Sequence, residues 1–238
     1  MKKQIKVVVL TLPNGESFPW ERKAIKRMHL HIRPDGGLYV STPMRAGEGD
    51  VLRFVTAHAA WIERHRQTLA KRGGMPSFET GEIFPVWGKP YTLQTREGRQ
   101  AGVRIAGGVA HLTHPSGADL AKKQTIVYNF YRQILREAIE KRLPYWQEKV
   151  GVTARGVSVK VMKTRWGSCN PRTGHVNIST ALARFDPACL DYVLVHELTH
   201  VLVPNHSDAF WRRVGEVYPR YRETVAHLRG NAPLWGNV

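Results

Sequence analysis

DPACLDYVLVHELTHVLVPNH, residues 186–206, is the stretch that decides the fold of the carboxy-terminal half. Asp186 can accept a hydrogen bond from the first free amides of a helix, and Pro187 suits the first helical position, where a missing N–H is harmless. Apolar residues then recur at the spacing of a helix with one buried face: Leu190, Val193, Leu194, Leu198, Val201 and Leu202. This pattern predicts a helix that begins at Pro187 and ends before Pro204.

This helix carries the motif His196-Glu197-Leu198-Thr199-His200, or HExxH. Histidines four residues apart lie on one side of a helix, roughly 5–6 Å apart at Cβ, so both imidazoles can bind one Zn²⁺ ion. His206 follows a predicted turn at Pro204 and can supply a third ligand. Glu197 is placed to act as general base for a water molecule. The spacing therefore predicts the zinc site of a hydrolase, with a peptide bond as the default substrate.

A second cluster, RWGSC at residues 165–169, lies between strands predicted at 157–161 and 175–180. Arg165 could stabilise an oxyanion or hold a substrate carboxylate or phosphate, and Trp166 is a candidate substrate contact beside it. The alternative is a tight loop that packs Trp166 under the zinc helix. We also expect strand 175–180 to offer its edge to an extended peptide.

The composition of the chain limits the classes of function that it can have. The chain has 238 residues, with 36 Lys and Arg against 19 Asp and Glu, so its formal net charge is +17. The basic residues are scattered, which leaves open a generally solvated surface or an anionic partner such as nucleic acid or a phosphorylated ligand. No stretch reaches the roughly 18 apolar residues of a membrane helix, so we expect no membrane partner. Cys169 and Cys189 form no CxxC pair, and we expect free thiols in a cytoplasmic protein.

The wider pattern predicts an α+β fold of two regions. Residues 1–113 are expected to form a strand-rich amino-terminal region with one helix and several hairpins. Residues 114–238 are expected to form the catalytic region, a small core of an active-site helix plus a short sheet. A linker at 114–124 would open this region, and Pro144 would kink or restart the helix that follows.

The motifs together resemble the YgjP-like metallopeptidase family, which is akin to the SprT-like and WLM zinc proteases. The residues that carry the resemblance, in order, are PDGG at 34–37, AAWIERHR at 59–66, WGKPY at 87–91, RWGSC at 165–169, HELTH at 196–200, NHSDAFW at 205–211 and YPRYR at 218–222. The resemblance covers nearly the whole chain and implies a zincin-type core. It implies one zinc ion held by His196, His200 and His206, with Glu197 as the catalytic base. The SprT-like relatives act on proteins near DNA, which a charge of +17 would suit.

Three functions remain open from the sequence. The first is a metallopeptidase that acts on peptide or unfolded protein. The second is a metal-dependent hydrolase of a nucleotide or another phosphate anhydride, with Arg165 holding the phosphates. The third is a basic nucleic-acid-associated protein with a structural zinc, against which the three histidines argue because structural sites usually have four protein ligands.

Overall fold

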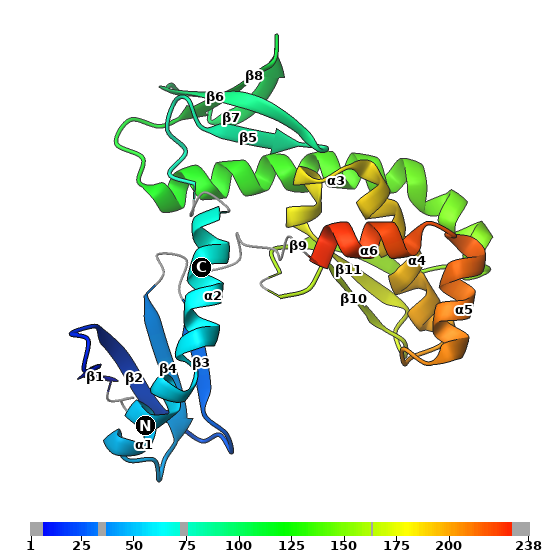
Figure 1. Cartoon of the computed structure of the whole chain (residues 1–238). Helices are drawn as coiled ribbons and strands as arrows, with labels where there is room; N and C mark the ends of the chain where they lie inside the picture. Colours follow the sequence, from blue (N-terminus) through cyan, green and yellow to red (C-terminus); the bar gives the residue numbers. More distant parts are fainter. Residues whose placement is uncertain (1–6, 33–36, 72–75, 163, 230–238) are drawn as a thin grey trace, which may run out of the picture. The chain divides into compact units, whose positions relative to one another are not determined.

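The computed structural model describes residues 7–32, 37–71, 76–162 and 164–229, and the chain divides into two compact units, Met1–Met75 and Pro76–Val238. Of the predicted PDGG turn, residues 34–36 lie outside the described ranges. Both units combine strands and helices, with a strand-rich amino-terminal part and a helical carboxy-terminal part, which confirms the predicted α+β class (Figure 1). Among the described residues, no helix is both long and apolar enough to cross a bilayer.

The first unit is a four-stranded sheet in the order β1-β2-β4-β3 with two helices. Its core contains Phe18, Trp20 and Val40 from the strands and Val51 and Val55 from α1. The single helix predicted here is two helices, because the chain leaves helical geometry at its C-cap, His58. The elements are β1 (Val7–Thr11), β2 (Ser17–Lys23), β3 (His29–Ile32), β4 (Leu38–Pro43), α1 (Glu48–Ala57) and α2 (Ala59–Lys71).

The second unit begins with a four-stranded sheet in the order β5-β6-β8-β7. Leu93, Ala110 and Leu112 on one face of this sheet join a core cluster with Val127 and Leu135 of the long helix α3. Because successive side chains on a strand point to opposite faces, the residues between these apolar ones lie on the other face of the sheet. The elements are β5 (Ile83–Val86), β6 (Lys89–Glu97), β7 (Gly102–Ala106), β8 (Val109–His114) and α3 (Leu120–Val150).

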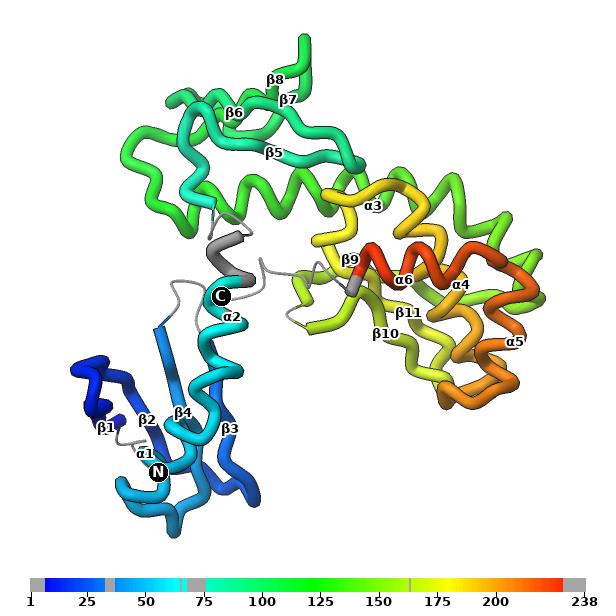
Figure 2. The backbone as a smooth tube through the Cα atoms, viewed as in Figure 1, coloured from blue at the N-terminus to red at the C-terminus, as the bar shows by residue number. Residues whose placement is uncertain are grey.

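The same helix α3 also packs against the part of the unit that carries the HExxH motif, so one core cluster extends from β5–β8 to α4 (Figures 1 and 2). That part is a three-stranded sheet in the order β10-β11-β9, followed by a short 3-10 helix and three α-helices. The elements are β9 (Gly156–Lys160), β10 (Gly167–Asn170), β11 (His175–Ser179), η1 (Thr180–Arg184), α4 (Pro187–Leu202), α5 (Asp208–Val217) and α6 (Tyr221–Arg229).

Around α3, one local expectation is wrong and one of two alternatives for Pro144 is excluded. The predicted linker at 114–124 is shorter, because α3 begins at Leu120 after Asp119, whose side chain accepts a hydrogen bond from the amide of Lys122 at 2.8 Å. Pro144 does not restart the helix, which continues as one element to Val150. Buried residues lie on both sides of the proline, Ile139 before it and Val150 after it, so packing holds the two halves together.

The compact units also divide the chain at a different place from the predicted functional regions. The division falls after Met75, because the β5–β8 sheet shares one core cluster with α3 and so belongs to the second unit. The assignment of residues 1–113 and 114–238 to two functional regions stays a prediction.

Candidate metal centre

The helix that carries the HExxH motif has the start that the sequence predicts. The side chain of Asp186 accepts a hydrogen bond from the amide of Ala188 at 2.8 Å, and Pro187 occupies the first turn. Such a cap is worth about 1 kcal/mol. The apolar face of α4 is buried at Leu190, Leu194 and Leu198, so packing fixes the rotation of the helix about its axis. That rotation determines where the two histidines of the motif point.

Three histidine side chains converge beside α4. His196 and His200 come from α4, and His206 comes from the segment between α4 and α5. The Nε2 atom of His206 lies 3.1 Å from Nε2 of His196 and 3.2 Å from Nε2 of His200. Ligand atoms at the corners of a tetrahedron around Zn²⁺, each about 2.0–2.1 Å from the ion, would be roughly 3.3 Å apart. The spacing of the three nitrogens therefore fits a tetrahedral metal ion, and their ligand atoms all lie within 4.8 Å of one another.

The outer nitrogens of two of these rings have partners that orient them. Nδ1 of His200 lies 3.2 Å from the carbonyl oxygen of Val203, which can only accept a hydrogen bond. The proton of neutral His200 is therefore on Nδ1, and the lone pair of Nε2 faces the other two histidines. Nδ1 of His196 lies 3.2 Å from the hydroxyl of Tyr192. Such contacts to the outer nitrogen are the usual way in which proteins orient metal-binding histidines.

Aromatic rings of α5 support the same cluster. Phe210 is fully buried, and its ring centroid lies 4.5–4.9 Å from those of all three histidines. Trp211 stacks on His206 at 5.6 Å. These contacts hold His206 against α4 although its own side chain is exposed.

Burial and neighbouring histidines favour the neutral forms of His196 and His200. Burial, together with the charges of His200 and His206, lowers the pKa of His196 to about 3. Burial also lowers the pKa of His200, against hydrogen bonds to Val203 and Pro204 that raise it. Neutral imidazoles are the form that binds a metal ion, so these surroundings favour the binding form of both histidines of α4.

Glu197 lies under the edge strand β10 and is 5% exposed. Burial raises the pKa of Glu197 to about 8, and the positive charge of Arg165 offsets part of this effect. A Cβ atom at position 167 would lie 2.5 Å from Oε1 of Glu197, so only glycine lets the strand approach this closely. A cation bound beside the carboxyl would favour its ionised form. Glu197 therefore has the surroundings of a group that exchanges a proton near neutral pH.

The two residues predicted to contact substrate, Arg165 and Trp166, have different surroundings in the structure. Arg165 is exposed, and its positive charge acts to lower the pKa of Glu197. Trp166 is half-buried and packs edge to face on Phe185, with ring centroids 5.1 Å apart. Burial, with the charge of Glu197, raises the pKa of Cys169 on the same strand to about 11, so this thiol stays protonated. Cys169 and Cys189 form no disulfide.

The strand expected to offer its edge to a peptide is in the middle of its sheet. β11 pairs antiparallel with β10 on one side and parallel with β9 on the other. The edge strands of this sheet are instead β9 and β10. The one that packs on α4 beside Glu197 is β10, residues 167–170, which the sequence did not predict as a strand.

Two contributors to the site were missed from the sequence. Tyr192 precedes His196 by four residues, the spacing at which side chains meet on a helix. The contact between them could therefore have been predicted from the sequence. Gly167 was quoted only as part of a motif, and nothing local shows that Glu197, thirty residues later, packs against it.

Parts of the chain are similar to known proteins. The family described as "YgjP-like, metallopeptidase domain" matches residues 26–231. The crystal structure of the metallopeptidase zymogen of Pyrococcus abyssi abylysin is similar to part of the chain, with 24% sequence identity and a TM-score of 0.36 over 38% of this chain and 90% of that one. No curated protein matches. The family match covers most of the chain, so the protein is a hydrolase that uses a divalent metal and acts on protein or peptide, and it belongs to the YgjP-like metallopeptidase family.

Proposed function

We propose that the chain is a zinc-dependent peptidase in which His196, His200 and His206 hold one zinc ion and Glu197 is the general base. The observation that carries this proposal is the convergence of three Nε2 atoms at the spacing of a tetrahedral site, next to a buried carboxyl. Nitrogen ligands and tetrahedral spacing suit zinc better than magnesium or calcium, which prefer oxygen ligands.

The residues around the site have distinct tasks in peptide hydrolysis. A zinc ion held there would lower the pKa of water and polarise the substrate carbonyl. Glu197 accepts a proton from the attacking water at its carboxylate and returns it to the leaving nitrogen. Tyr192 and the carbonyl of Val203 keep two imidazoles in position. Arg165, which is exposed beside Glu197, is placed to hold a negatively charged oxygen of the substrate.

The substrate in this proposal is an extended peptide that lies along β10. Among the described residues, β10 pairs only with β11, so its other edge is available for main-chain hydrogen bonds. This edge passes directly over Glu197 at Gly167, which would bring a paired backbone to the base. An unfolded segment meets this requirement, because its backbone groups are free to pair.

The other two functions considered from the sequence have weaker support. Hydrolysis of a phosphate anhydride would use the same metal, but the family is one of peptidases. A structural zinc would normally have a fourth protein ligand, and no further His, Cys, Asp or Glu joins the three histidines in the part of the chain that the structure describes.

Metal removal tests the proposed function. Zinc-loaded protein is expected to cleave a chemically unfolded protein, chelation is expected to abolish cleavage, and added zinc is expected to restore it. Mass spectrometry of the products identifies hydrolysed peptide bonds. Parallel reactions contain nucleoside triphosphates, and zinc-dependent phosphate release without peptide cleavage would contradict the proposal.

Gly167→Ala is expected to lower kcat for peptide cleavage by at least about tenfold while zinc content stays at one ion per chain. The added methyl group would clash with Glu197, at 2.5 Å from Oε1, and displace the base but not the histidines. Turnover is measured with elemental analysis of the same samples. Gly102→Ala is the matched control, since a Cβ there has no neighbour within 4 Å. Equal turnover in wild type and Gly167→Ala would show that the contact does not position Glu197.

A further inference from the structure

The outer face of the β5–β8 sheet carries basic side chains that have no part in the metal centre. Since neighbouring residues on a strand point to opposite faces, Arg96, Arg104 and His111 lie on the face opposite the apolar core. Arg104 pairs directly with His111, and Arg96 with Thr113, so these side chains are neighbours across three strands. Nε of Arg96 donates a hydrogen bond to Oγ1 of Thr113 at 3.3 Å.

This face forms a groove. The groove has a volume of 670 Å³ and lies between β6, β7, β8 and the loop at 98–101. Arg96, Arg99, Arg104 and His111 line it, and we call it the basic groove. The three arginine side chains are exposed, so their charges face solvent rather than protein.

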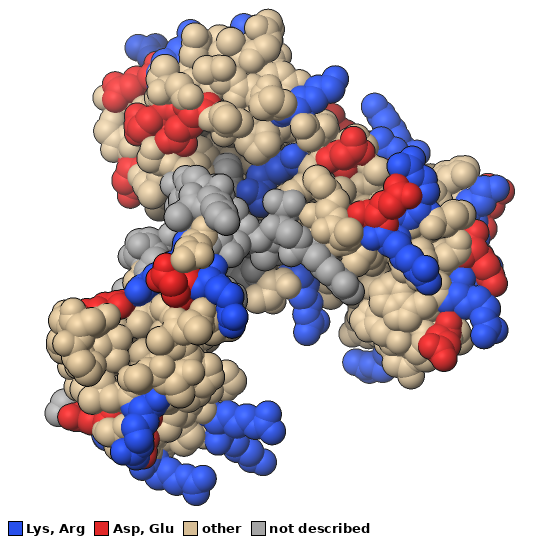
Figure 3. All heavy atoms as spheres, viewed as in Figure 1, with Lys and Arg blue, Asp and Glu red and all other residues tan. Residues whose placement is uncertain are grey.

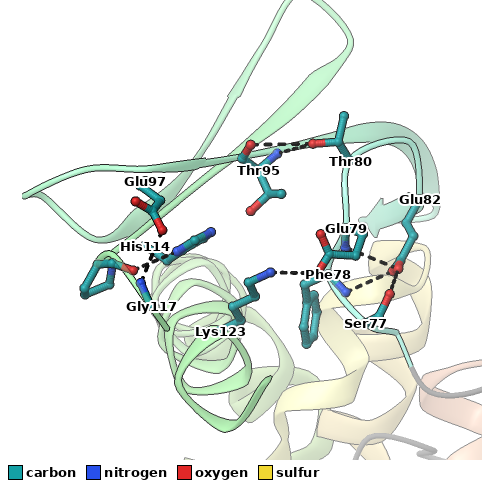
Figure 4. A network of polar contacts seen from close by, with 11 residues as sticks. Ser77, Phe78, Glu79, Thr80, Glu82, Thr95, Glu97, His114, Gly117 and Lys123 are labelled. Atoms are coloured by element: carbon teal, nitrogen blue, oxygen red, sulfur yellow. Dashed lines mark hydrogen bonds and ion pairs between the residues drawn. The ribbon is translucent and has the colours of Figure 1, made fainter. Parts of the chain in front are cut away.

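The arginines of the basic groove form no ion pair with any carboxylate of the described residues. Within the described ranges, no carboxylate forms an ion pair with Arg96, Arg99 or Arg104, whereas arginines elsewhere, such as Arg142, pair with one. The acid in the lining, Glu97, already accepts a hydrogen bond from the amide of Gly117 at 3.2 Å, toward which it points in Figure 4. The three guanidinium groups that line one groove carry charges of the same sign, so an external anion would stabilise this arrangement.

We propose that the basic groove binds duplex nucleic acid through its backbone phosphates. Arginine forms paired hydrogen bonds with phosphate oxygens, and several arginines on two strands and a loop suit successive phosphates better than one isolated ion. Apart from the imidazole of His111, no described residue of the lining has an aromatic ring on which unpaired bases could stack, which favours a duplex over a single strand.

The charge of the rest of the surface also favours a polyanion as partner, but it does not determine where the polyanion binds. A net charge of +17 attracts any polyanion over a distance. Lys and Arg side chains are spread over the face seen in Figure 3, with Asp and Glu side chains among them. The basic groove differs because its lining holds three arginines and one acid, Glu97, so positive charge is concentrated at this place on the surface.

Binding of a fluorescein-labelled 20-base-pair DNA duplex to the full chain, followed by fluorescence anisotropy at 50–300 mM salt, tests the proposal. The double variant Arg96→Gln/Arg104→Gln is expected to weaken binding by about tenfold or more at 100 mM salt. It is also expected to reduce the slope of log K against log salt by about 2, since each lost phosphate contact removes about 0.9. Peptide cleavage by the same variant is expected to be unchanged, which separates this proposal from the proposed function.

A second double variant provides the matched control. Arg136→Gln/Arg172→Gln also lowers the net charge from +17 to +15, at two exposed arginines outside the groove. It is expected to weaken binding by less than about twofold. Equal weakening by the two double variants, or no binding by wild type at 100 mM salt, would overturn the proposal. If the first double variant melts below wild type, Arg99→Gln in the loop is used instead, with an expected loss of about 1 in the salt slope.

Competition distinguishes a duplex from other phosphates. Unlabelled duplex is expected to displace the label, whereas an oligonucleotide of one strand and inorganic triphosphate, at the same concentration of phosphate groups, are expected to displace it at least about tenfold less well. Equal displacement by triphosphate would show a site for small anions and overturn the proposal.

Discussion

Glu197→Gln is expected to lower the rate of peptide hydrolysis by about 10²–10⁴-fold, with zinc content unchanged. Glutamine has the same shape as the neutral carboxyl, so it fits the closely packed space under Gly167. It cannot accept a proton from water, and the three histidines do not depend on it. The measurement is single-turnover cleavage of an unfolded protein substrate, with zinc counted in the same samples.

The control for this change is Glu216→Gln on α5, whose carboxylate is exposed and pairs with Arg213. That variant is expected to cleave at the wild-type rate. Wild-type turnover in Glu197→Gln would remove Glu197 as the base. Loss of zinc together with activity would mean instead that the carboxyl helps to hold the metal, which the proposed mechanism does not allow.

His206→Ala is expected to weaken zinc binding by more than about 100-fold. Loss of a residue that merely orients a ligand already costs about 10–100-fold, and His206 is proposed as a ligand. The side chain is exposed, so its removal leaves no cavity in the core and the chain should fold. Competition with a chromophoric chelator measures the affinity, and thermal unfolding of the metal-free protein checks the fold.

His29→Ala is the matched control for the histidine change, since His29 is exposed on β3 in the other compact unit. It is expected to bind zinc as wild type does. A His206→Ala variant that binds zinc with wild-type affinity would show that His206 is not a ligand.

The helix of the metal centre was predictable because its signals are local. Asp186 and Pro187 mark its start within two residues, and the apolar spacing fixes which face is buried. His196 and His200 must then lie on one side. Even His206 could be proposed, because only a short turn separates it from the helix.

Other parts of the site depend on contacts that no local pattern reveals. β10 contains Gly167, Ser168, Cys169 and Asn170, which have little preference for strands, and it forms because it pairs with β11. A proline inside a helix is unfavourable by about 3 kcal/mol, so the sequence argued for a kink or a restart at Pro144. Burial of residues on both sides of it in α3 outweighs that preference. In each case packing between distant segments decided the outcome.

The position of the basic groove could not be predicted from the sequence for the same reason. The sequence shows +17 but scatters the basic residues along the chain, and only the pairing of β6, β7 and β8 brings Arg96 and Arg104 to one face. Composition could indicate an anionic partner but could not locate a site for it.

The claim on which the proposed function depends is that three imidazole nitrogens hold a single zinc ion beside Glu197. The most direct measurement is X-ray absorption at the zinc edge of the zinc-loaded chain, with one ion per chain confirmed by elemental analysis. The expected spectrum shows three histidine nitrogens at about 2.0–2.1 Å and one further light atom. A sulfur neighbour at about 2.3 Å, or fewer than three imidazoles, would contradict the claim.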